Sequence, residues 1–458
     1  MNNQAAVILA AGEGKRMNSD LPKVLHPVCG QSMLAHVVKA VRGICDDIIV
    51  VVGHKDEKVK AAFGETVRYA QQAQQLGTGH AVMQAEPLLP QEGNVFVLCG
   101  DTPLLSFEMM ESMLATHQSS HASATILTAH VPEPLGYGRI IRDDKGNVSK
   151  IVEERDASAK ERRVCEINTG SYIFNAKILR NSLAGLHSNN EQGEYYLTDC
   201  IEFIIKQNAF VATSILPDYR MALGVNDRIQ LAQAQTLMQS RINDALMATG
   251  VTMVDPRTTY VDAGVEIGRD TVIFPNTTIK GTTQIGEGCV VGPNSEVIDC
   301  YIGRGTVFRH SVATSCTMAE DVTVGPFAHL RPETVLKRGV KIGDFVEIKK
   351  SQIGSNSKVA HLSYIGDADI GSDVNMGGGI IVVNYDGRTK HKTVICDQSF
   401  VGCNSNLVAP VTIGQGAFVA AGSTITKDVP AGALSLARAQ QVNKEGLAAR
   451  FLGEKKDE

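Results

Sequence analysis

An aliphatic residue recurs at every sixth position through most of the C-terminal half of the chain, and this period limits the possible folds more than any other feature. Neither the 3.6-residue period of an α-helix nor the two-residue period of a β-strand produces it. Three flat six-residue faces that close into a triangular coil do produce it, with each aliphatic side chain inside the prism. The residues expected to point inward are Ile267, Ile273, Ile279, Ile285, Val291, Val297, Ile302, Phe308, Val312, Met318, Val324, Leu330, Leu336, Ile342, Ile348, Ile353, Val359, Ile365, Ile370, Met376, Ile395, Val401, Leu407, Ile413, Val419 and Ile425.

The same repeat predicts corners and one interruption. Small residues such as Ser363 and Ala417 often stand four positions after an inward residue, where a corner leaves little room. The segment GIIVVNYDGRTKHK, residues 379–392, breaks the repeat. A loop ejected from a solenoid is usually a binding element, so we expect this segment to contribute to a site.

The N-terminal half has a different pattern. From Ala5 to about Arg228, short apolar runs such as AVILA and DIIVVVG alternate with helical patterns, which predicts βαβ units with a parallel sheet. Residues 227–249 contain no Gly or Pro and predict a connecting helix that Asn226 or Asp227 can cap. We therefore predict an α/β + β chain. It consists of a Rossmann-like domain over residues 1–228, a linker helix over 229–249 and a left-handed parallel β-helix of hexapeptide repeats over 250–458.

Charge and composition exclude several classes of protein. The formal net charge is −5 over 458 residues, and a chain without a basic stripe is not expected to bind nucleic acid. The start of the chain does not resemble a signal peptide, and no apolar run approaches the roughly 20 residues that span a bilayer. The ten cysteines are scattered without a CxxC pair, as is typical of a reducing compartment. We expect a soluble, cytoplasmic protein with no membrane or nucleic-acid partner.

A glycine-containing turn follows the first apolar run directly. AVILA leads into AGEGKRM, so Gly12 and Gly14 place exposed backbone N–H groups at a strand-to-helix turn, where phosphates bind. Arg16 and Lys23 could add charge-assisted hydrogen bonds to the same phosphates. Taken alone, the pattern is equally compatible with an ordinary glycine turn and a solvated surface lysine.

The whole string LAAGEGKRMNSDLPKVL, residues 9–25, resembles the signature of sugar-1-phosphate nucleotidyltransferases. Six more strings follow in the order found in the N-acetylglucosamine-1-phosphate uridylyltransferase branch of that family: QQLGTGHA (74–81), CGDTPLL (99–105), GYGRI (136–140), IVEE (151–154), EINTG (166–170) and GVNDR (224–228). The resemblance implies a nucleotidyltransferase domain in which a sugar phosphate attacks the α-phosphorus of UTP and expels pyrophosphate. Positioning and charge neutralisation supply most of the catalysis in such reactions.

The resemblance also implies roles for single residues. Arg16 and Lys23 would act on the phosphates, and Asp101 with Asn226 would hold Mg²⁺, which prefers oxygen ligands. The alternative interpretations, which apply if the resemblance is set aside, are purely structural. Asp101 and Asn168 would then be turn residues, Asn226 a helix cap and Glu153 an exposed strand carboxylate. UTP and UDP-N-acetylglucosamine would be bound by Leu9, Ala10, Ala11, Gly12, Lys23, Gln72, Gly77, Thr78, Gly138, Glu153, Asn168 and Asn226, with Gln72, Gly77 and Thr78 at the uracil ring and Gly138, Glu153 and Asn168 at the sugar.

In the second half, Arg331 and Lys349 follow inward residues and lie 18 residues apart, which is one full coil. They should therefore stack on one edge of the prism. Two stacked cations away from the core suggest an anion such as a phosphate between them. The alternative is a solvated pair at a corner near Glu347.

His361 stands two positions after inward Val359, and Tyr364 stands five positions after it, so both are expected to face outward. Asn375 follows inward Val374 and should also face outward. An outward histidine, with an unperturbed pKa near 6.5, suits a general base, although a lone histidine is more often structural.

The strings KVAHLSYIGDADIG (358–371) and GGGIIVVNYDG (377–387) closely resemble the acetyltransferase half of the same bifunctional enzyme. By this resemblance, His361 deprotonates the amine of glucosamine-1-phosphate, which then attacks the thioester of acetyl-CoA without an acyl-enzyme. Glucosamine-1-phosphate would be bound by Arg331, Lys349, Tyr364 and Asn375, and acetyl-CoA by Gly378, Asn384, Tyr385, Cys403, Ala421 and Arg438.

Two of these positions depart from the family, which often has Ala at Gly378 and Ser at Cys403. We interpret Cys403 as a small buried residue and not as a nucleophile. A loop on a single prism cannot enclose acetyl-CoA alone, and family members pack three parallel prisms. A homotrimer is therefore expected.

The sequence thus predicts bifunctional synthesis of UDP-N-acetylglucosamine, with acetyl transfer to glucosamine-1-phosphate followed by uridylyl transfer from UTP. One alternative is a monofunctional sugar-1-phosphate nucleotidyltransferase whose β-helix is structural or regulatory, as in the similar ADP-glucose and GDP-mannose enzymes. The other is a scaffold or sugar-nucleotide-binding protein without turnover.

Overall fold

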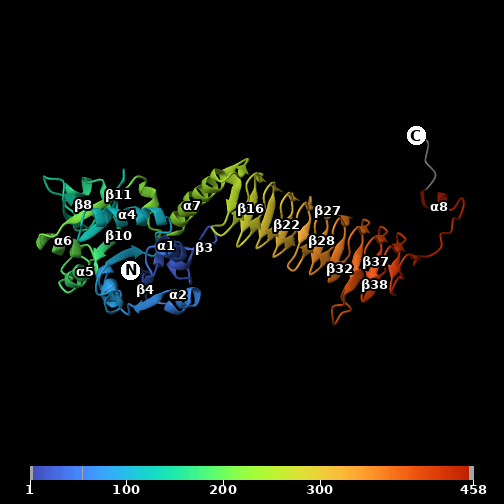
Figure 1. Cartoon of the computed structure of the whole chain (residues 1–458), viewed down its shortest axis with the longest axis horizontal. Coiled ribbons are helices and arrows are strands. Elements are labelled where there is room, and N and C mark those ends of the chain that lie inside the picture. The colour runs from blue at the N-terminus through green and yellow to red at the C-terminus, as the bar shows by residue number, and fades with distance from the viewer. Residues whose placement is uncertain (1–3, 54, 453–458) are drawn as a thin grey trace. The chain divides into compact units, whose positions relative to one another are not determined.

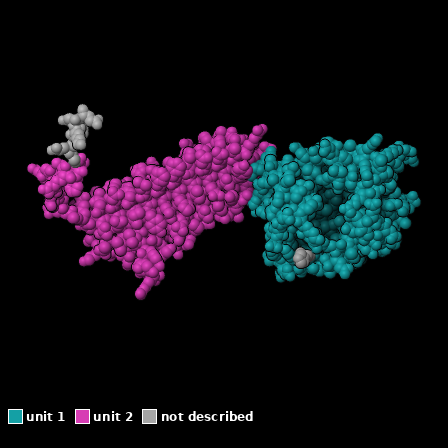
Figure 2. Space-filling view, turned by 180° about the vertical axis from the view of Figure 1, so that it is seen from behind, with its two compact units in different colours: residues 1–241 teal, residues 242–458 magenta. Residues whose placement is uncertain are grey.

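The computed structural model describes residues 4–53 and 55–452. The chain divides into two compact units, residues 1–241 (unit 1) and 242–458 (unit 2), which Figure 2 colours separately. Among the described residues, no helix is both long and apolar enough to cross a membrane.

Unit 1 is built on a mixed nine-stranded sheet, with strand order β11-β7-β10-β6-β1-β4-β5 and with β8 and β9 added beside β10. The strands β1, β4 and β6 are parallel, whereas β10 runs antiparallel to both β6 and β7. The expected parallel sheet is found in β1, β4, β5 and β6, and the expectation fails at the antiparallel β10. β10 follows the antiparallel pair β8–β9, and an antiparallel neighbour needs no helical crossover. The strands are β1 (Gln4–Leu9), β4 (Asp47–Val52), β5 (Arg68–Gln71), β6 (Asn94–Cys99), β7 (Ala124–His130), β8 (Arg139–Arg142), β9 (Val148–Val152), β10 (Glu166–Asn175) and β11 (Val211–Leu216), with a separate ribbon of β2 (Pro27–Val28) and β3 (Gln31–Ser32).

Helices cover both faces of this sheet. One apolar layer contains residues of α1, α2 and α4, and the other contains residues of α3, α5 and α6. The alternation of side chains in β1 explains both layers, because Ile8 enters the first and Val7 the second. The helices of unit 1 are α1 (Met33–Val41), α2 (Asp56–Phe63), α3 (Thr78–Ala85), α4 (Phe107–Ser119), α5 (Ala176–Leu183) and α6 (Asp199–Lys206), with 3₁₀ turns η1 (Lys15–Met17), η2 (Lys23–Leu25), η3 (Glu86–Leu88), η4 (Glu161–Arg163) and η5 (Tyr219–Ala222).

The predicted connecting helix is α7 (Arg228–Ala248), which begins and ends one residue inside the predicted segment. The Asp227 carboxylate accepts a hydrogen bond from the Gln230 backbone N–H at 2.8 Å, so Asp227 caps the helix. Within unit 2, Ile242, Leu246 and Met247 of α7 pack against the prism core.

Unit 2 is a three-sided prism of eleven-, ten- and nine-stranded parallel sheets, with the coils stacked along one axis in Figure 1. From β12 to β37 each strand pairs with the strand three later in the chain, so three strands make one coil, and β39 pairs with β41. The first sheet contains β12 (Thr252–Met253), β15 (Val272–Ile273), β18 (Val290–Val291), β21 (Val307–Phe308), β24 (Thr323–Val324), β27 (Lys341–Asp344), β30 (Lys358–His361), β33 (Asn375–Met376), β36 (Phe400–Val401), β39 (Phe418–Val419) and β41 (Leu434–Ser435). The second contains β13 (Thr259–Val261), β16 (Thr277–Lys280), β19 (Ser295–Ile298), β22 (Val312–Thr314), β25 (His329–Leu330), β28 (Glu347–Lys349), β31 (Tyr364–Gly366), β34 (Ile381–Val383), β37 (Asn406–Val408) and β40 (Thr424–Ile425). The third contains β14 (Glu266–Ile267), β17 (Gln284–Ile285), β20 (Tyr301–Ile302), β23 (Thr317–Met318), β26 (Val335–Leu336), β29 (Gln352–Ile353), β32 (Ala368–Ile370), β35 (Thr393–Ile395) and β38 (Val411–Ile413). The turn η6 (Pro256–Thr258) and the short helix α8 (Ala449–Leu452) complete the unit.

The predicted inward residues form the core of this prism, with one exception. Val312 is 38% exposed, and its neighbour Ala313 is fully buried instead. The inward positions there are Phe308, Ala313 and Met318, so the repeat takes two successive steps of five residues. Because neighbouring side chains of a strand point to opposite faces, a shift of one residue turns Val312 outward.

The predicted interruption at residues 379–392 is shorter than expected. Ile380 and Val382 are fully buried in the prism, so the repeat continues through the first part of this segment. The chain leaves the coil only after β34, and a bridge between Tyr385 and Lys390 closes the ejected loop. The expected small corner residues Ser363 and Ala417 are both buried.

Two candidate active sites

The turn after β1 is shaped by contact between Gly14 and Lys23. The strand leads into the 3₁₀ turn η1 and not into an α-helix, so the expected strand-to-helix turn lacks the N-terminus of an α-helix. Gly14 has φ of +63°, and a Cβ there would lie 2.6 Å from the Cβ of Lys23. A residue other than glycine would therefore push the Lys23 segment away from the turn.

A cavity of about 290 Å³ opens beside this turn. It brings together nine of the residues predicted to act on the nucleotide: Leu9, Ala10, Ala11, Gly12, Lys23, Gln72, Gly77, Thr78 and Asp101. The structure adds Val24, Gln75, Ala81, Cys99 and Glu194, which sequence reasoning missed. Gln75 lies inside the quoted QQLGTGHA string, so the motif could have identified it; its amide donates to the carbonyl oxygen of Ala11 at 2.5 Å.

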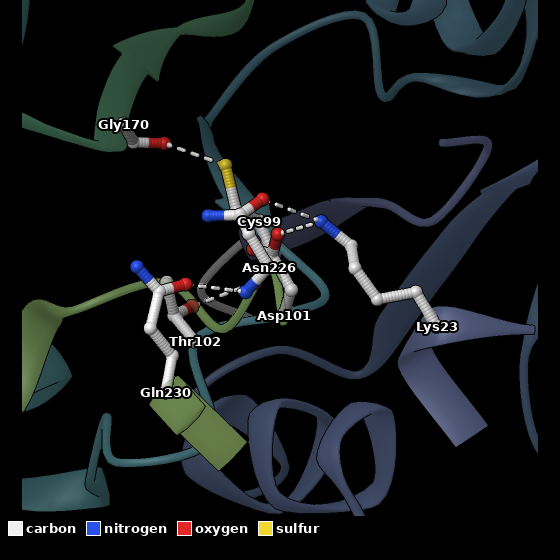
Figure 3. Close-up of polar contacts among 7 residues, drawn as sticks. All are labelled: Lys23, Cys99, Asp101, Thr102, Gly170, Asn226 and Gln230. Atoms are coloured by element: carbon white, nitrogen blue, oxygen red, sulfur yellow. Dashed lines mark hydrogen bonds and ion pairs between the residues drawn. The ribbon is translucent and has the colours of Figure 1, made fainter. Parts of the chain in front are cut away.

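Three distant segments meet at Lys23 (Figure 3). Its ammonium is hydrogen-bonded to the Asp101 carboxylate and lies 3.2 Å from the side-chain oxygen of Asn226. Asn226 is held in place because its backbone N–H donates to the Gln230 side chain at 2.7 Å. The oxygens of Asp101 and Asn226 thus converge on one position that a cation occupies.

Arg16 is not brought into this arrangement. It is exposed on η1 and does not line the cavity.

The residues predicted to hold the sugar form a second cluster in unit 1. The backbone N–H of Asn168 donates to the carbonyl of Gly138 at 2.8 Å. A Cβ at Gly138 would lie 3.4 Å from a carboxylate oxygen of Glu153, so the three residues are neighbours. Burial raises the pKa of the Glu153 carboxyl, and Thr198 donates a hydrogen bond to it at 3.3 Å. A buried carboxylate able to accept hydrogen bonds from hydroxyls suits sugar recognition.

This sugar cluster and the nucleotide cavity are adjacent. Cys99 lines the cavity, and its thiol points to the carbonyl of Gly170 at a Sγ–O distance of 3.7 Å (Figure 3). Gly170 in turn donates its N–H to the Asn168 side chain at 3.1 Å. Asn168 is therefore a buried strand residue that also makes a local turn contact.

In unit 2, the repeat places Arg331 and Lys349 on neighbouring coils, as the backbone N–H of Arg331 donates to the carbonyl of Ile348 at 2.8 Å. Arg331 also forms an ion pair with Glu347 at 2.7 Å, which was the alternative interpretation. The nearby ammonium of Lys390, and then Arg331, lower the pKa of Lys349. The cations of Arg331, Lys349 and Lys390 outnumber the carboxylates of Glu347 and Asp367 here, which leaves an excess of positive charge for an anion.

Lys390 is a functional candidate that sequence reasoning missed. It lies on the ejected loop, 41 residues after Lys349 along the chain, so the repeat does not give its position. The signal available was only that the loop GIIVVNYDGRTKHK carries several basic residues.

Tyr364 and Asn384 meet above Gly366. A Cβ on Gly366 would lie 2.5 Å from the Tyr364 hydroxyl and 2.7 Å from the Asn384 amide nitrogen, so glycine is needed for their approach. The Asn384 amide donates to the Asp367 carboxylate at 2.5 Å. Tyr385 beside it is 56% exposed on the loop.

Four of the predicted acetyl-CoA residues lie along one corner of the prism, which runs from His361 to later coils. The backbone N–H of Gly379 donates to the carbonyl of His361, and the N–H of Asn404 to the carbonyl of Gly378. One coil further, the N–H of Gly422 donates to the carbonyl of Cys403. The guanidinium of Arg438 donates to the carbonyl of Ala421 at 3.0 Å. The row thus runs His361, Gly378, Cys403, Ala421 and Arg438.

Two predicted residues of unit 2, Cys403 and Asn375, differ in their exposure. Cys403 is exposed, so the interpretation of it as a buried residue is wrong; the residue lies at an outward turn and not at an inward position. Asn375 lies outside the row, on β33 between Lys358 and Phe400 of the neighbouring strands, and is half-buried. Among the described residues, no group of three or more His, Cys, Asp or Glu side chains could hold a metal ion.

Comparisons with known proteins match both units. A model of the MobA-like NTP transferase domain matches residues 6–165, and a model of the bacterial transferase hexapeptide (six repeats) matches residues 264–299 and 392–427. The bifunctional protein GlmU of Geobacillus sp. (strain WCH70) is 54% identical over 98% of this chain and 99% of its own length. The GlmU protein of Geobacillus thermodenitrificans is 53% identical over the full length of both chains, and that of Caldanaerobacter subterraneus is 54% identical over 97% of this chain and 98% of its own. The resemblance seen in both halves of the sequence is thereby confirmed, and the chain belongs to the family of bifunctional GlmU proteins.

Proposed function

We propose that the chain makes UDP-N-acetylglucosamine in two reactions. Unit 2 transfers an acetyl group from acetyl-CoA to glucosamine-1-phosphate, and unit 1 transfers uridylyl from UTP to the resulting N-acetylglucosamine-1-phosphate and releases pyrophosphate. Family membership and the presence of one phosphate-binding cluster in each unit support this proposal.

In unit 1, UTP lies in the cavity beside β1, and Lys23 neutralises its phosphates. Gln72, Gly77 and Thr78, which line the cavity, contact the uracil ring. The N-acetylglucosamine moiety is held by Gly138, Glu153 and Asn168, and Cys99 lies between the two groups.

Asp101 and Asn226 would hold Mg²⁺. Their oxygens already converge on the Lys23 ammonium, and one carboxylate and one amide leave the remaining positions to waters and substrate phosphates, as Mg²⁺ prefers. Mg²⁺ held there would neutralise charge on the phosphates and orient them. The Lys23 ammonium, which lies at these two oxygens, would neutralise the neighbouring phosphates.

In unit 2, Arg331, Lys349 and Lys390 bind the phosphate of glucosamine-1-phosphate, and Tyr364 with Asn375 contacts the sugar. His361 is the base for the amine, and its side chain is 61% exposed in the single chain. Asn384 and Tyr385 lie near the reacting acetyl group, and acetyl-CoA follows the row of Gly378, Cys403, Ala421 and Arg438.

The single observation that carries the second activity is the outward position of His361 on a prism that also carries a cluster of three cations. A prism that served only assembly or regulation would have no use for an exposed histidine, three converging cations and a loop folded beside them. This observation favours the bifunctional assignment over a monofunctional nucleotidyltransferase.

The active assembly is a homotrimer. Phe327, Phe345 and Leu362 occupy successive turns at one corner, and their side chains are 56%, 58% and 63% exposed in the single chain. All three have positive φ, which is costly for bulky residues, and the two phenyl rings stack with centroids 5.4 Å apart. A second copy of this chain packed on the corner would bury these side chains, and Leu362 directly follows His361, so the copy would lie beside the acetyl-transfer site.

We also propose the domain boundaries 1–228, 229–249 and 250–458, because α7 and the first coil begin near them. The cytoplasm is the proposed location, since all ten cysteines are free thiols, as expected in a reducing compartment.

The test is to assay pyrophosphate release and CoA release on the full chain. Both are expected in the parent protein, with pyrophosphate release requiring UTP and N-acetylglucosamine-1-phosphate. His361→Ala should abolish CoA release and leave pyrophosphate release unchanged. Full CoA release by that variant would favour the monofunctional alternative, and failure of both reactions with every sugar phosphate would favour a binding protein.

A further inference from the structure

His361 is hydrogen-bonded to an acidic residue that lies outside every motif considered above. Its ring nitrogen Nδ1 lies 2.5 Å from Oδ1 of Asp344. A carboxylate can only accept a hydrogen bond, so Nδ1 carries the hydrogen, and the other ring nitrogen, Nε2, is left with its lone pair. Within the described part of the chain, Nε2 has no hydrogen-bond partner.

The backbone brings these two residues together by a local change in the prism. β27 and β30 are four residues long, whereas every other strand of their sheet has two residues. The two added positions extend the ladder until Asp344 pairs directly with His361. Paired residues of adjacent parallel strands lie about 4.8 Å apart, which puts the carboxylate within reach of the ring.

Gly343 permits this extension. A Cβ at this position would overlap the carbonyl oxygen of Ala360, the residue before His361, so only glycine lets the two strands approach here. On the other side of the Asp344–His361 pair, the N–H of Leu362 donates to the carbonyl of Asp344 at 3.0 Å. The backbones on both sides of the Asp344–His361 contact are therefore fixed.

The charges around the pair agree with this arrangement. The hydrogen bond from His361 lowers the pKa of the Asp344 carboxyl, which therefore stays ionised at neutral pH. His361 is the ion-pair partner of Asp344 among the described residues.

We propose that Asp344 is the positioning residue of the acetyl-transfer base: it fixes the ring orientation and the tautomer of His361 and stabilises the imidazolium that forms during the reaction. The inference rests on the proposed acetyl transfer. Nε2 takes a proton from the amine as the N–C bond to the acetyl carbon forms and the C–S bond to CoA breaks. The imidazolium then returns this proton to the departing CoA thiolate, so the enzyme ends unchanged.

The proposal separates into a hydrogen-bonding role and a charge role, and two variants distinguish them. Asp344→Ala removes both, whereas Asp344→Asn keeps an oxygen that accepts from Nδ1–H and removes the charge. Asp344→Ala should lower kcat for CoA release by about 10- to 100-fold, the usual effect of losing a residue that orients a functional histidine. Its KM for glucosamine-1-phosphate should stay unchanged, because Arg331 and Lys349 still hold the phosphate.

Asp344→Asn should also lower kcat, because the charge that stabilises the imidazolium is lost, and the acidic limb of its pH–rate profile should move to lower pH. The neutral amide no longer stabilises the imidazolium, so a lower pH is needed to protonate the base. A purely structural role for Asp344 would not move this limb. Asp321→Asn is the matched control, because Asp321 is also an outward carboxylate of the prism and pairs with Arg338 at 3.3 Å, away from His361.

An unchanged KM for glucosamine-1-phosphate shows that unit 2 of each Asp344 variant is folded, and pyrophosphate release by the same preparations checks that unit 1 is unaffected. The positioning role is overturned if Asp344→Ala keeps the parent kcat and Asp344→Asn keeps the parent pH profile while His361→Ala has lost CoA release. Retention of CoA release by His361→Ala would instead refute the proposed base itself, so the two failures are distinguishable.

Discussion

Replacing Gly14 by alanine should damage uridylyl transfer without changing acetyl transfer. The new Cβ would lie 2.6 Å from the Cβ of Lys23, about 1 Å closer than an ordinary van der Waals contact. A Cβ is fixed to the main chain, so rotating the Lys23 side chain cannot relieve the overlap. The segment η2 must therefore move, and the Lys23 ammonium moves with it.

The magnitude follows from what Lys23 contributes. A hydrogen bond to a charged group is worth about 1.5–3 kcal/mol, so losing one to the nucleotide phosphates slows the reaction by roughly 10- to 150-fold. In addition, alanine at φ of +63° costs about 1–2 kcal/mol of folding free energy, which lowers the melting temperature of unit 1 but does not by itself slow the reaction.

The assay measures both products from one preparation. Pyrophosphate release by Gly14→Ala should fall by roughly 10- to 150-fold. Its CoA release should stay within about twofold of the parent, well under the tenfold change that 1.36 kcal/mol represents. Gly288→Ala is the matched control, because Gly288 has nearly the same φ, +64°, and nothing lies within 4 Å of its Cβ position. If Gly14→Ala released pyrophosphate at the parent rate, the close approach of Gly14 and Lys23 would have no role in catalysis.

Three further results are expected. Chelation of divalent cations by EDTA should stop pyrophosphate release and leave CoA release unchanged, because only unit 1 has the Asp101–Asn226 oxygen pair; loss of both products would contradict this assignment. Glu153→Gln should raise KM for N-acetylglucosamine-1-phosphate and increase the free energy of urea unfolding at pH 7. Burial raises the pKa of the Glu153 carboxyl in the folded protein above its unfolded value of 4.5. The parent therefore loses stability as pH rises from 4.5 through the folded pKa. The gain in unfolding free energy of Glu153→Gln should vanish near pH 4. Phe327→Ser with Phe345→Ser should shift sedimentation toward monomers and reduce CoA release, whereas an unchanged sedimentation coefficient would show that the copies do not meet at this corner.

The period of six predicted the prism well, because a solenoid coil contacts only its neighbours and its geometry follows from local spacing. The same locality explains the error at Val312. Only the types of the side chains can reveal a step of five in place of six. Val312 is a larger apolar residue than Ala313, so the sequence pointed to Val312 as the inward residue, although Ala313 is the buried one. The pairing of Asp344 with His361 was also readable in principle, since 17 residues, a coil with one five-residue step, separate them.

The errors in unit 1 have a different cause. The alternating pattern of strands and helices does not state in which direction each strand runs, so the antiparallel β10 was missed. The exposure of Cys403 was missed because the residue lies on a turn, where composition gives no direction to the side chain.

By itself, the sequence determined the two architectures, the length of the connecting helix and the residue types available for each reaction, because these depend on periodicity and on motifs that are contiguous in the chain. Only the tertiary structure decided which distant groups meet. Lys23 reaches Asp101 across 78 residues and Asn226 across 203, and Lys390 joins Lys349 from a loop outside the repeat. No local pattern contains these contacts, because the packing of whole strands and the path of a loop create them.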